Sequence, residues 1–251
     1  MKEYQAVIVE NKEIANGICS VTFALPVATK VRAGQFGDIA VGGTHLLRRP
    51  IAICKVEENL VTFCYQVKGE GTQRLKEMKV GEETSVLMPL GNGFFVEETE
   101  KEVALVGGGV GIFPLISVLR EYAGKKTINA YMGFRNKGAV CGLEEFEKAD
   151  KFVGVTDDGS YGEKMNSVQA FAADLEKGYR PDVVLSCGPL PMLKALKKLV
   201  EEKNIPCYVS LEERMGCGIG ACLVCVCDLS SGAKARVCKD GPVFNVTEVE
   251  L

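Results

Sequence analysis

The sequence predicts a multi-domain α+β protein with an N-terminal antiparallel β-barrel, an α/β domain built on a parallel sheet, and a small C-terminal module. Short β-favouring runs broken by Gly, Asn and Pro fill residues 4–96, and strand-then-helix units follow from about residue 100. Near the end, five of the eleven cysteines fall within residues 217–238. We expect domains at 1–98, 99–211 and 212–251, with the acidic stretch Glu97–Glu102 as the hinge between the first two.

The barrel region contains five runs rich in residues that favour strands. They are Gln5–Val9, Ile18–Phe23, Phe36–Val41, Val61–Tyr65 and Glu83–Met88. A further motif, Arg48-Arg49-Pro50-Ile51-Ala52, precedes the turn Gly69-Glu70-Gly71-Thr72. An arginine beside a rigid proline strand could hold a pyrophosphate, because a guanidinium matches phosphate oxygens with two parallel hydrogen bonds. A solvated basic pair is the alternative interpretation.

The α/β region alternates apolar strands with segments of helical spacing, which indicates a parallel sheet. The expected strands are Val103–Val106, Thr127–Met132, Lys151–Thr156, Val183–Ser186 and Cys207–Ser210. The expected helices are Pro114–Tyr122, Leu143–Lys148, Val168–Leu175 and Pro191–Glu202.

A glycine loop joins the first of these strands to its helix through Gly107, Gly108, Gly109 and Gly111. Free amides and the helix dipole would face an anion there, and the missing side chains would let it come close, so the loop predicts a dinucleotide pyrophosphate site. The segment Tyr131–Arg135 supplies no ribose-binding acid, which disfavours a standard Rossmann dehydrogenase.

Two further segments follow strands of the same sheet. Asp157 lies in the loop 156–160, and Cys187-Gly188-Pro189 ends a later strand. Ligands bind beyond the carboxyl ends of parallel strands, so both segments are candidate contacts to the dinucleotide. Ordinary turns are the alternative, because Gly, Pro and Asp favour turns anyway.

The C-terminal cysteines Cys217, Cys222, Cys225 and Cys238 have the spacing C-x4-C-x2-C-x12-C, and the first three fit the plant-type 2Fe-2S pattern. Neighbouring glycines would let backbone amides approach the sulfurs. Structural zinc, which more often uses two C-x2-C pairs, and buried free thiols are the alternatives. Cys227 follows two residues after Cys225, and we expect it to be a neighbour of the site and not a ligand.

Composition excludes several classes of function. With 30 basic and 33 acidic residues the net charge is −3, which disfavours nucleic acid as a partner. No apolar run is long enough to span a bilayer, and acids occupy the early positions where a signal peptide is apolar, so we expect a cytoplasmic protein with reduced thiols and no membrane contact. His45 is the only histidine, and we assign no catalytic residue.

The predicted dinucleotide site and the predicted 2Fe-2S site together require a third cofactor. NADH releases two electrons as a hydride, whereas a 2Fe-2S cluster accepts one electron at a time. A flavin is the usual cofactor that connects these two kinds of transfer, which favours the flavin interpretation of the arginine motif in the barrel.

These motifs, in their order along the chain, resemble the ferredoxin reductase superfamily. The resemblance rests on Arg-Pro-Ile with Gly-x-Gly-Thr, Gly-Gly-Gly-Val-Gly-x-x-Pro-Leu, Thr-Asp-Asp-Gly-Ser, Cys-Gly-Pro and Cys-Gly-Ile-Gly-Ala-Cys-x-x-Cys. Within the superfamily, the segments 212–222 and 236–244 are similar to the electron transfer subunits of dihydroorotate dehydrogenase B.

The resemblance implies cofactors and their residues. It places FAD on Arg49, Pro50, Ile51, Ala52, Cys64, Tyr65, Gln66, Gly71 and Thr72, the 2Fe-2S cluster on Cys217, Cys222, Cys225 and Cys238, and NAD on the glycine loop side. Ala52 stands where this family usually has serine and Gln66 where arginine is common, and the stretch 162–165 after Tyr161 also departs from the usual pattern.

The resemblance also implies an activity and a partner. A catalytic subunit with FMN would oxidise dihydroorotate, and this chain would relay the electrons through the cluster and FAD to NAD⁺ in pyrimidine biosynthesis, as a heterotetramer with two copies of each subunit. One alternative is an NADH-dependent flavin and iron-sulfur reductase subunit of a ferredoxin, sulfite reductase or hydrogenase system. Another is a zinc-stabilised binding module without redox chemistry.

Overall fold

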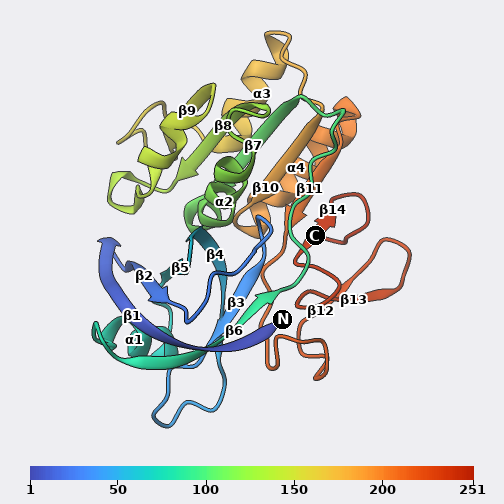
Figure 1. The fold of residues 1–251 in the computed structure, drawn as a ribbon. Helices are drawn as coiled ribbons and strands as arrows, with labels where there is room; N and C mark the ends of the chain where they lie inside the picture. Colours follow the sequence, from blue (N-terminus) through green and yellow to red (C-terminus); the bar gives the residue numbers. More distant parts are fainter.

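Six antiparallel strands close into a barrel at the N-terminus, as the sequence predicts (Figure 1). The computed structural model describes residues 1–251, and the barrel order is β1-β2-β5-β4-β3-β6. The strands are β1 (Lys2–Ala15), β2 (Ile18–Ala24), β3 (Phe36–Ile39), β4 (Arg49–Glu57), β5 (Leu60–Gln66) and β6 (Glu83–Leu90). Alternate residues point inward, and the rings of Phe23 and Phe63 meet edge to face in the barrel core.

Two segments of the barrel differ from the expected elements. The arginine-proline motif lies at the start of a full strand, β4, which is not among the expected strands because Pro50 is unusual inside a strand. The predicted turn at Gly69–Thr72 instead begins a helix, α1 (Glu70–Glu77). Thr72 Oγ1 accepts hydrogen bonds from the backbone N–H of Lys68 (2.9 Å) and Gly69 (3.2 Å), so the threonine fixes the entry to this helix.

The α/β domain contains a six-stranded sheet in the order β14-β11-β10-β7-β8-β9. The strands β7 (Glu102–Gly108), β8 (Thr127–Phe134), β9 (Lys151–Thr156), β10 (Val183–Cys187) and β11 (Cys207–Ser210) are mutually parallel. Strand order reverses between β7 and β10, because β8 and β9 continue to one side and β11 to the other. Such a reversal opens a crevice at the carboxyl ends of the strands.

Helices cover both faces of this sheet (Figure 1). The helix α2 (Ile112–Tyr122) packs on one face, while α3 (Ser167–Glu176) and α4 (Leu190–Lys203) cover the other. Alternation along β7 explains the division, since Leu105 joins the α2 side and Val106 the α3 side. Short 3₁₀ helices occupy η1 (Gly109–Gly111), η2 (Lys137–Ala139) and η3 (Leu143–Lys148), the last where an α-helix was expected.

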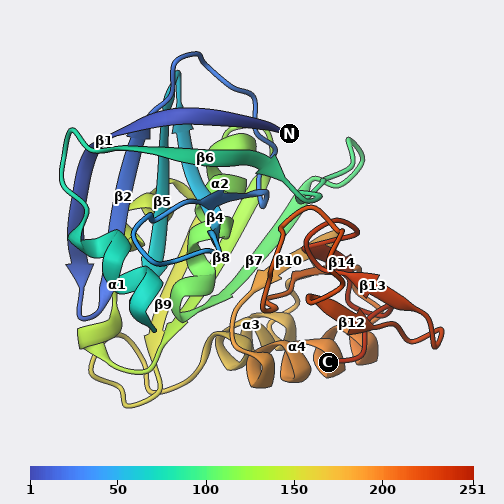
Figure 2. The ribbon, with the colours of Figure 1, turned by 90° about the horizontal axis from the view of Figure 1, so that it is seen from below.

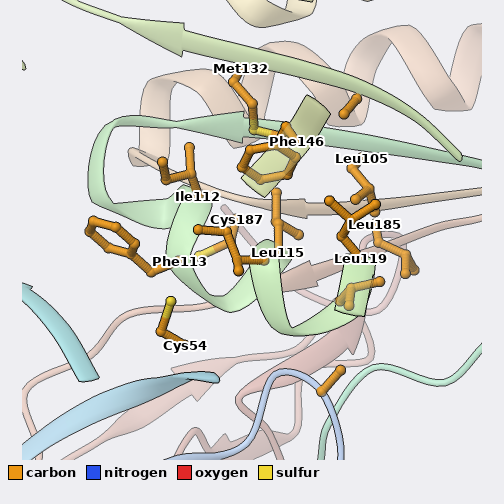
Figure 3. Close-up of a cluster of buried hydrophobic side chains, with 14 of the residues drawn as sticks. Cys54, Leu105, Ile112, Phe113, Leu115, Leu119, Met132, Phe146, Leu185 and Cys187 are labelled. Atoms are coloured by element: carbon orange, nitrogen blue, oxygen red, sulfur yellow. The ribbon is translucent and has the colours of Figure 1, made fainter. Parts of the chain in front are cut away.

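The core on the α2 side continues into the barrel (Figure 3). Cys54 of β4 lies below α2 and points toward Phe113, and both belong to the same buried cluster. The backbone N–H of Gly34 donates to Ser117 Oγ (3.0 Å), and that of Ala33 to Glu121 Oε2 (2.8 Å). Apolar packing and these hydrogen bonds hold the barrel against the α/β domain.

The C-terminal module is joined to the sheet more closely than the sequence suggests (Figure 2). It contains β12 (Val226–Asp228), β13 (Lys234–Arg236) and β14 (Val243–Asn245). The last strand pairs antiparallel with β11, so the predicted parallel sheet becomes mixed. This pairing covers an edge of the sheet that would otherwise expose unpaired backbone groups. The proposed boundaries at 98/99 and 211/212 remain predictions. None of the helices combines the length and apolarity needed to cross a membrane.

Candidate functional site

The glycine loop lies at the strand-order reversal, where β7 ends and η1 leads into α2. Gly109 has φ +55°, and nothing lies within 4 Å of the point that a Cβ would occupy, so its backbone is open to a ligand. At Gly111 a Cβ would lie 2.4 Å from the carbonyl oxygen of Cys187. The absence of a side chain at Gly111 therefore lets the loop touch the end of β10.

A cavity of about 810 Å³ opens over this loop. Its walls include the predicted residues Gly108, Gly109, Gly111, Asp157, Gly188 and Pro189. The cavity thus brings together the carboxyl ends of β7, β9 and β10, as expected for the dinucleotide site. Gly107 lies outside it, because the space for a Cβ there is taken by Met132 and Leu115 in the sheet core.

A second cavity, of about 250 Å³, lies between the barrel and the α/β domain. Its walls include the predicted flavin residues Pro50, Ile51, Ala52, Cys64, Tyr65, Gln66 and Thr72. Cys187, predicted on the dinucleotide side, lines this cavity instead. Half of the twenty lining residues are hydrophobic, including Phe113 on α2, which suits the planar ring of a flavin.

The two cavities share a wall made of four residues. Gln66 and Lys68 come from the barrel, and Val110 and Glu212 from the α/β side. Gln66 and Lys68 are two residues apart at the end of β5, where an extended chain turns such residues to one side. A ring in one cavity and a ring in the other can therefore meet at this wall.

Arg49 lines neither cavity and lies instead at the start of α1. The Arg49 guanidinium lies directly over Gly71, where a Cβ would be only 1.7 Å from Arg49 Nε. Arg49 Nη1 donates to the carbonyls of Leu47 (2.8 Å) and Arg48 (3.0 Å), and no carboxylate pairs with it. A guanidinium without a carboxylate at the first turn of a helix can accept the pyrophosphate of FAD.

The cysteine loop directs backbone amides at its own sulfurs. Cys217 Sγ accepts hydrogen bonds from the N–H of Ala221 (3.2 Å) and Cys222 (3.4 Å). Cys238 Sγ accepts one from Gly220 (3.1 Å), and Cys225 Sγ one from the N–H of Cys238 (3.4 Å). Such donors stabilise thiolates and the sulfurs of an iron-sulfur cluster.

The electrostatics of Cys217 follow from this arrangement. Burial disfavours its thiolate, but the backbone N–H groups of Ile219, Cys222 and Ala221, with the Cys222 side chain, outweigh burial and lower the pKa of Cys217 to about 6. By contrast, burial without such donors raises the pKa of Cys207, whose thiol lies in the sheet core. The loop therefore prepares a thiolate, which is the form that binds iron.

The four predicted cluster cysteines stand in two pairs. The side chain of Cys222 hydrogen-bonds Cys217, and that of Cys225 hydrogen-bonds Cys238. No group of three or more His, Cys, Asp or Glu side chains is placed to hold a single metal ion. Two pairs suit a cluster of two irons in which each iron takes two thiolates. Cys227 lies on β12 opposite Ala235, outside both pairs, and its burial raises its pKa.

Sequence reasoning overlooked two residues of the shared wall, Lys68 and Glu212. Lys68 could have been found from its position two residues after Gln66, just beyond the end of β5. Glu212 follows β11, so the rule that ligands bind beyond strand carboxyl ends pointed to it. Val110, inside the glycine motif, was treated only as a spacer.

Comparison with known proteins gives consistent relationships. A family model described as the iron-sulfur cluster binding domain of dihydroorotate dehydrogenase B matches residues 212–250. A protein from Bacillus pumilus (strain SAFR-032), named dihydroorotate dehydrogenase B (NAD(+)), electron transfer subunit, is 42% identical over 264 residues, covering 100% of this chain and 99% of its own. A protein of the same name from Geobacillus sp. (strain WCH70) is 40% identical over 263 residues and fully covered, as is this chain.

Solved structures share the fold. The NADH-dependent reduced ferredoxin-NADP oxidoreductase is 28% identical with a TM-score of 0.86, covering 98% of this chain and 89% of its own. A cytochrome P450 reductase from Amycolatopsis, 21% identical, has a TM-score of 0.70 over 81% of this chain and 67% of its own, and this likeness concerns the fold alone.

Proposed function

The chain belongs to the family of electron transfer subunits of dihydroorotate dehydrogenase B (NAD(+)), and we propose that its two cavities and its cysteine loop hold the cofactors of that relay. Electrons from dihydroorotate pass through a 2Fe-2S cluster and FAD to NAD⁺, in the synthesis of pyrimidines. Oxidation of dihydroorotate to orotate releases two electrons and two protons, and NAD⁺ takes up both electrons and one proton.

The shared wall between the cavities is the observation that carries this proposal. Hydride transfer between a nicotinamide and a flavin needs the reacting atoms at about 3–3.5 Å. Gln66 and Lys68 of the barrel border both cavities, as do Val110 of the glycine loop and Glu212 after β11, so both rings can be held at one place. When bound, FAD exchanges a hydride with NAD and single electrons with the cluster.

Different residues of the chain would bind FAD and NAD. Arg49, over the first turn of α1, would pair with the FAD pyrophosphate, and the apolar walls around Ile51 and Phe113 would exclude water from the flavin ring. Gly109 admits the dinucleotide to the backbone at the start of α2. Lys68 and Glu212 would offer a donor and an acceptor to a nicotinamide held at the shared wall.

The cysteine pairs supply the iron ligands. Cys217 with Cys222 would hold one iron, and Cys225 with Cys238 the other, while the amides of Gly220, Ala221 and Cys222 stabilise the negative charge of the site. Cys227 has no part in this set. The two adjoining cavities favour this relay over a zinc-binding module without redox chemistry, because such a module would not need them.

The partner belongs to the same proposal. A catalytic subunit with FMN would complete the enzyme, two copies of each forming a heterotetramer, in a cytoplasm that keeps the cysteines free of disulfides. The side chains of Ile219 (41% exposed) and Leu223 (62% exposed) on the cysteine loop are apolar, which supports docking there. Met215, which precedes the first cysteine of this loop by two residues, is half-buried, lines the flavin cavity and packs against its own domain.

A reductase subunit of another iron-sulfur system remains the second candidate, favoured by the TM-score of 0.86 to the NADH-dependent reduced ferredoxin-NADP oxidoreductase. The 42% identity over the whole chain favours the dihydroorotate system.

The decisive experiment separates this chain from its partner. The purified holo-chain should pass electrons from NADH to artificial acceptors but should not convert dihydroorotate to orotate, because the base and the FMN for that step are assigned to the catalytic subunit. Adding the FMN subunit should restore NAD⁺-dependent orotate formation. Orotate production by the single chain, or ferredoxin reduction without any response to the FMN subunit, would contradict the proposal.

A further inference from the structure

Asp38 is a buried carboxyl group between the barrel and the cysteine loop. It lies on β3, opposite Pro50 of β4 and Leu87 of β6, and only 3% of its surface is exposed. A Cβ on Gly218 would lie 2.9 Å from Asp38 Oδ2. Gly218 is not one of the proposed ligands, but it follows Cys217 directly, so the carboxyl group lies against the cysteine loop.

This carboxyl group lacks the partners that burial normally requires. Oδ1 is fully buried and accepts no hydrogen bond. Arg48 reaches only the backbone carbonyl of Asp38 (3.3 Å) and pairs its charge with Glu3. An unpaired buried carboxylate is unfavourable, and the group then responds by binding a proton.

The charges around Asp38 determine how readily its carboxyl group binds a proton. Arg48 and Arg49 face it from the β4 side, β6 presents the uncharged Leu87, and Gly218 of the cysteine loop lies against Oδ2. Burial raises the pKa of Asp38 to about 6, although both arginines oppose the rise. A modest increase in nearby negative charge would therefore protonate it near neutral pH.

We propose that Asp38 binds one proton when the cluster beside it gains one electron, and releases that proton when the electron leaves. The proposal rests on the cluster assignment made above. The electron comes from the oxidation of dihydroorotate and the proton from solvent, so each dihydroorotate drives two such cycles. Because added negative charge on the cluster favours the protonated acid, linkage requires that protonation in turn favours the reduced cluster.

The test is a redox titration of the cluster in the holoprotein, followed by electron paramagnetic resonance between pH 5 and pH 8. In the wild type, the affinity for the electron should fall as pH rises, by up to tenfold per pH unit. Asp38→Asn keeps the shape of the side chain but cannot titrate, so its potential should not vary with pH. Asp228→Asn is the matched control, because this acid of the C-terminal module is 60% exposed and pairs with Lys234.

The possible outcomes separate the role of Asp38 from the cluster assignment. A wild-type potential independent of pH, or a slope that persists in Asp38→Asn, overturns the role of Asp38 while leaving the relay intact. If Asp38→Asn fails to assemble the cluster, redox difference infrared spectra of the wild type decide, since reduction must produce a protonated carboxyl band and its absence overturns the proposal. A wild type with no cluster signal overturns the cluster assignment and this inference with it.

Discussion

The glycine loop at Gly107–Gly111 and the cysteine loop at Cys217–Cys225 both bring backbone close to a negatively charged group, but they are held in different ways. The glycine loop lies between β7 and α2, whose adjoining residues Val106 and Ile112 are fully buried. The cysteine loop has no helix or strand between Ser210 and Val226. Its hydrogen bonds to sulfur, such as Gly220 to Cys238, are part of what shapes it.

This difference shows how far each loop is shaped before its ligand binds. Strand and helix set the amides of the glycine loop whether or not a dinucleotide is present, because their own packing stabilises them. In the cysteine loop, the groups that shape the backbone are also the groups that bind the metal. Changes in the first loop should therefore weaken one affinity, whereas changes in the second should remove the site.

The largest effect is expected at the ligands of the cysteine loop. Cys222→Ser should reduce bound iron and sulfide to near zero, because a hydroxyl replaces a thiolate that iron requires. Cys227→Ser, on the neighbouring strand, and Cys207→Ser, in the sheet core, should keep the cluster. Iron content and visible absorption measure how much cluster each variant retains. Equal bleaching by Cys227→Ser would remove the distinction between ligand and neighbour.

A third anion site, at Arg49, uses a side-chain charge where the two loops use backbone. Arg49→Ala should weaken FAD binding by about 3 kcal/mol, or about 100-fold, through loss of charge-assisted hydrogen bonds to the pyrophosphate. Arg48→Ala is the matched control, since Arg48 already pairs with Glu3 and Ser85. Equilibrium dialysis of FAD gives the two affinities. If Arg49→Ala retains FAD as tightly as Arg48→Ala does, the assignment is wrong.

A smaller and more selective effect is expected in the glycine loop. Gly109→Val should weaken NADH binding by about tenfold, because valine disfavours φ +55° and its side chain would enter the cavity. Gly124→Val introduces similar strain at φ +75° in a turn that borders neither cavity, and it should leave NADH affinity unchanged. Titration of flavin fluorescence measures both. Cluster loss in Gly109→Val would contradict the independence of the two loops.

The subtlest test concerns thiol reactivity in iron-free protein. Since thiolate is the reactive form and the pKa of Cys217 is lowered to about 6, its alkylation should rise through about pH 6 and level off above it. Cys207, whose pKa burial raises, should stay unmodified in the folded chain. Mass spectrometry after iodoacetamide treatment at several pH values resolves the two. A Cys217 midpoint near that of an ordinary thiol would mean that the loop amides do not act on it.

The sequence by itself determined the barrel, the α/β alternation and the identity of the cysteine and glycine motifs. These features are local: period-two and helical patterns fix element type, and the spacing of Cys217, Cys222 and Cys225 fixes one tight loop. Element ends were less determined, as at Gly69–Thr72, where a hydrogen bond from a single threonine side chain changes a turn into a helix start.

Only the tertiary structure decided which residues meet across domains. The shared wall joins Lys68 of the barrel to Glu212 beyond β11, and the contact between Asp38 and Gly218 joins β3 to the last module. It also placed β14 beside β11 in the main sheet. Such pairs are far apart in the sequence, and no local period records them, because they depend on how α2 and its buried core orient the barrel against the sheet.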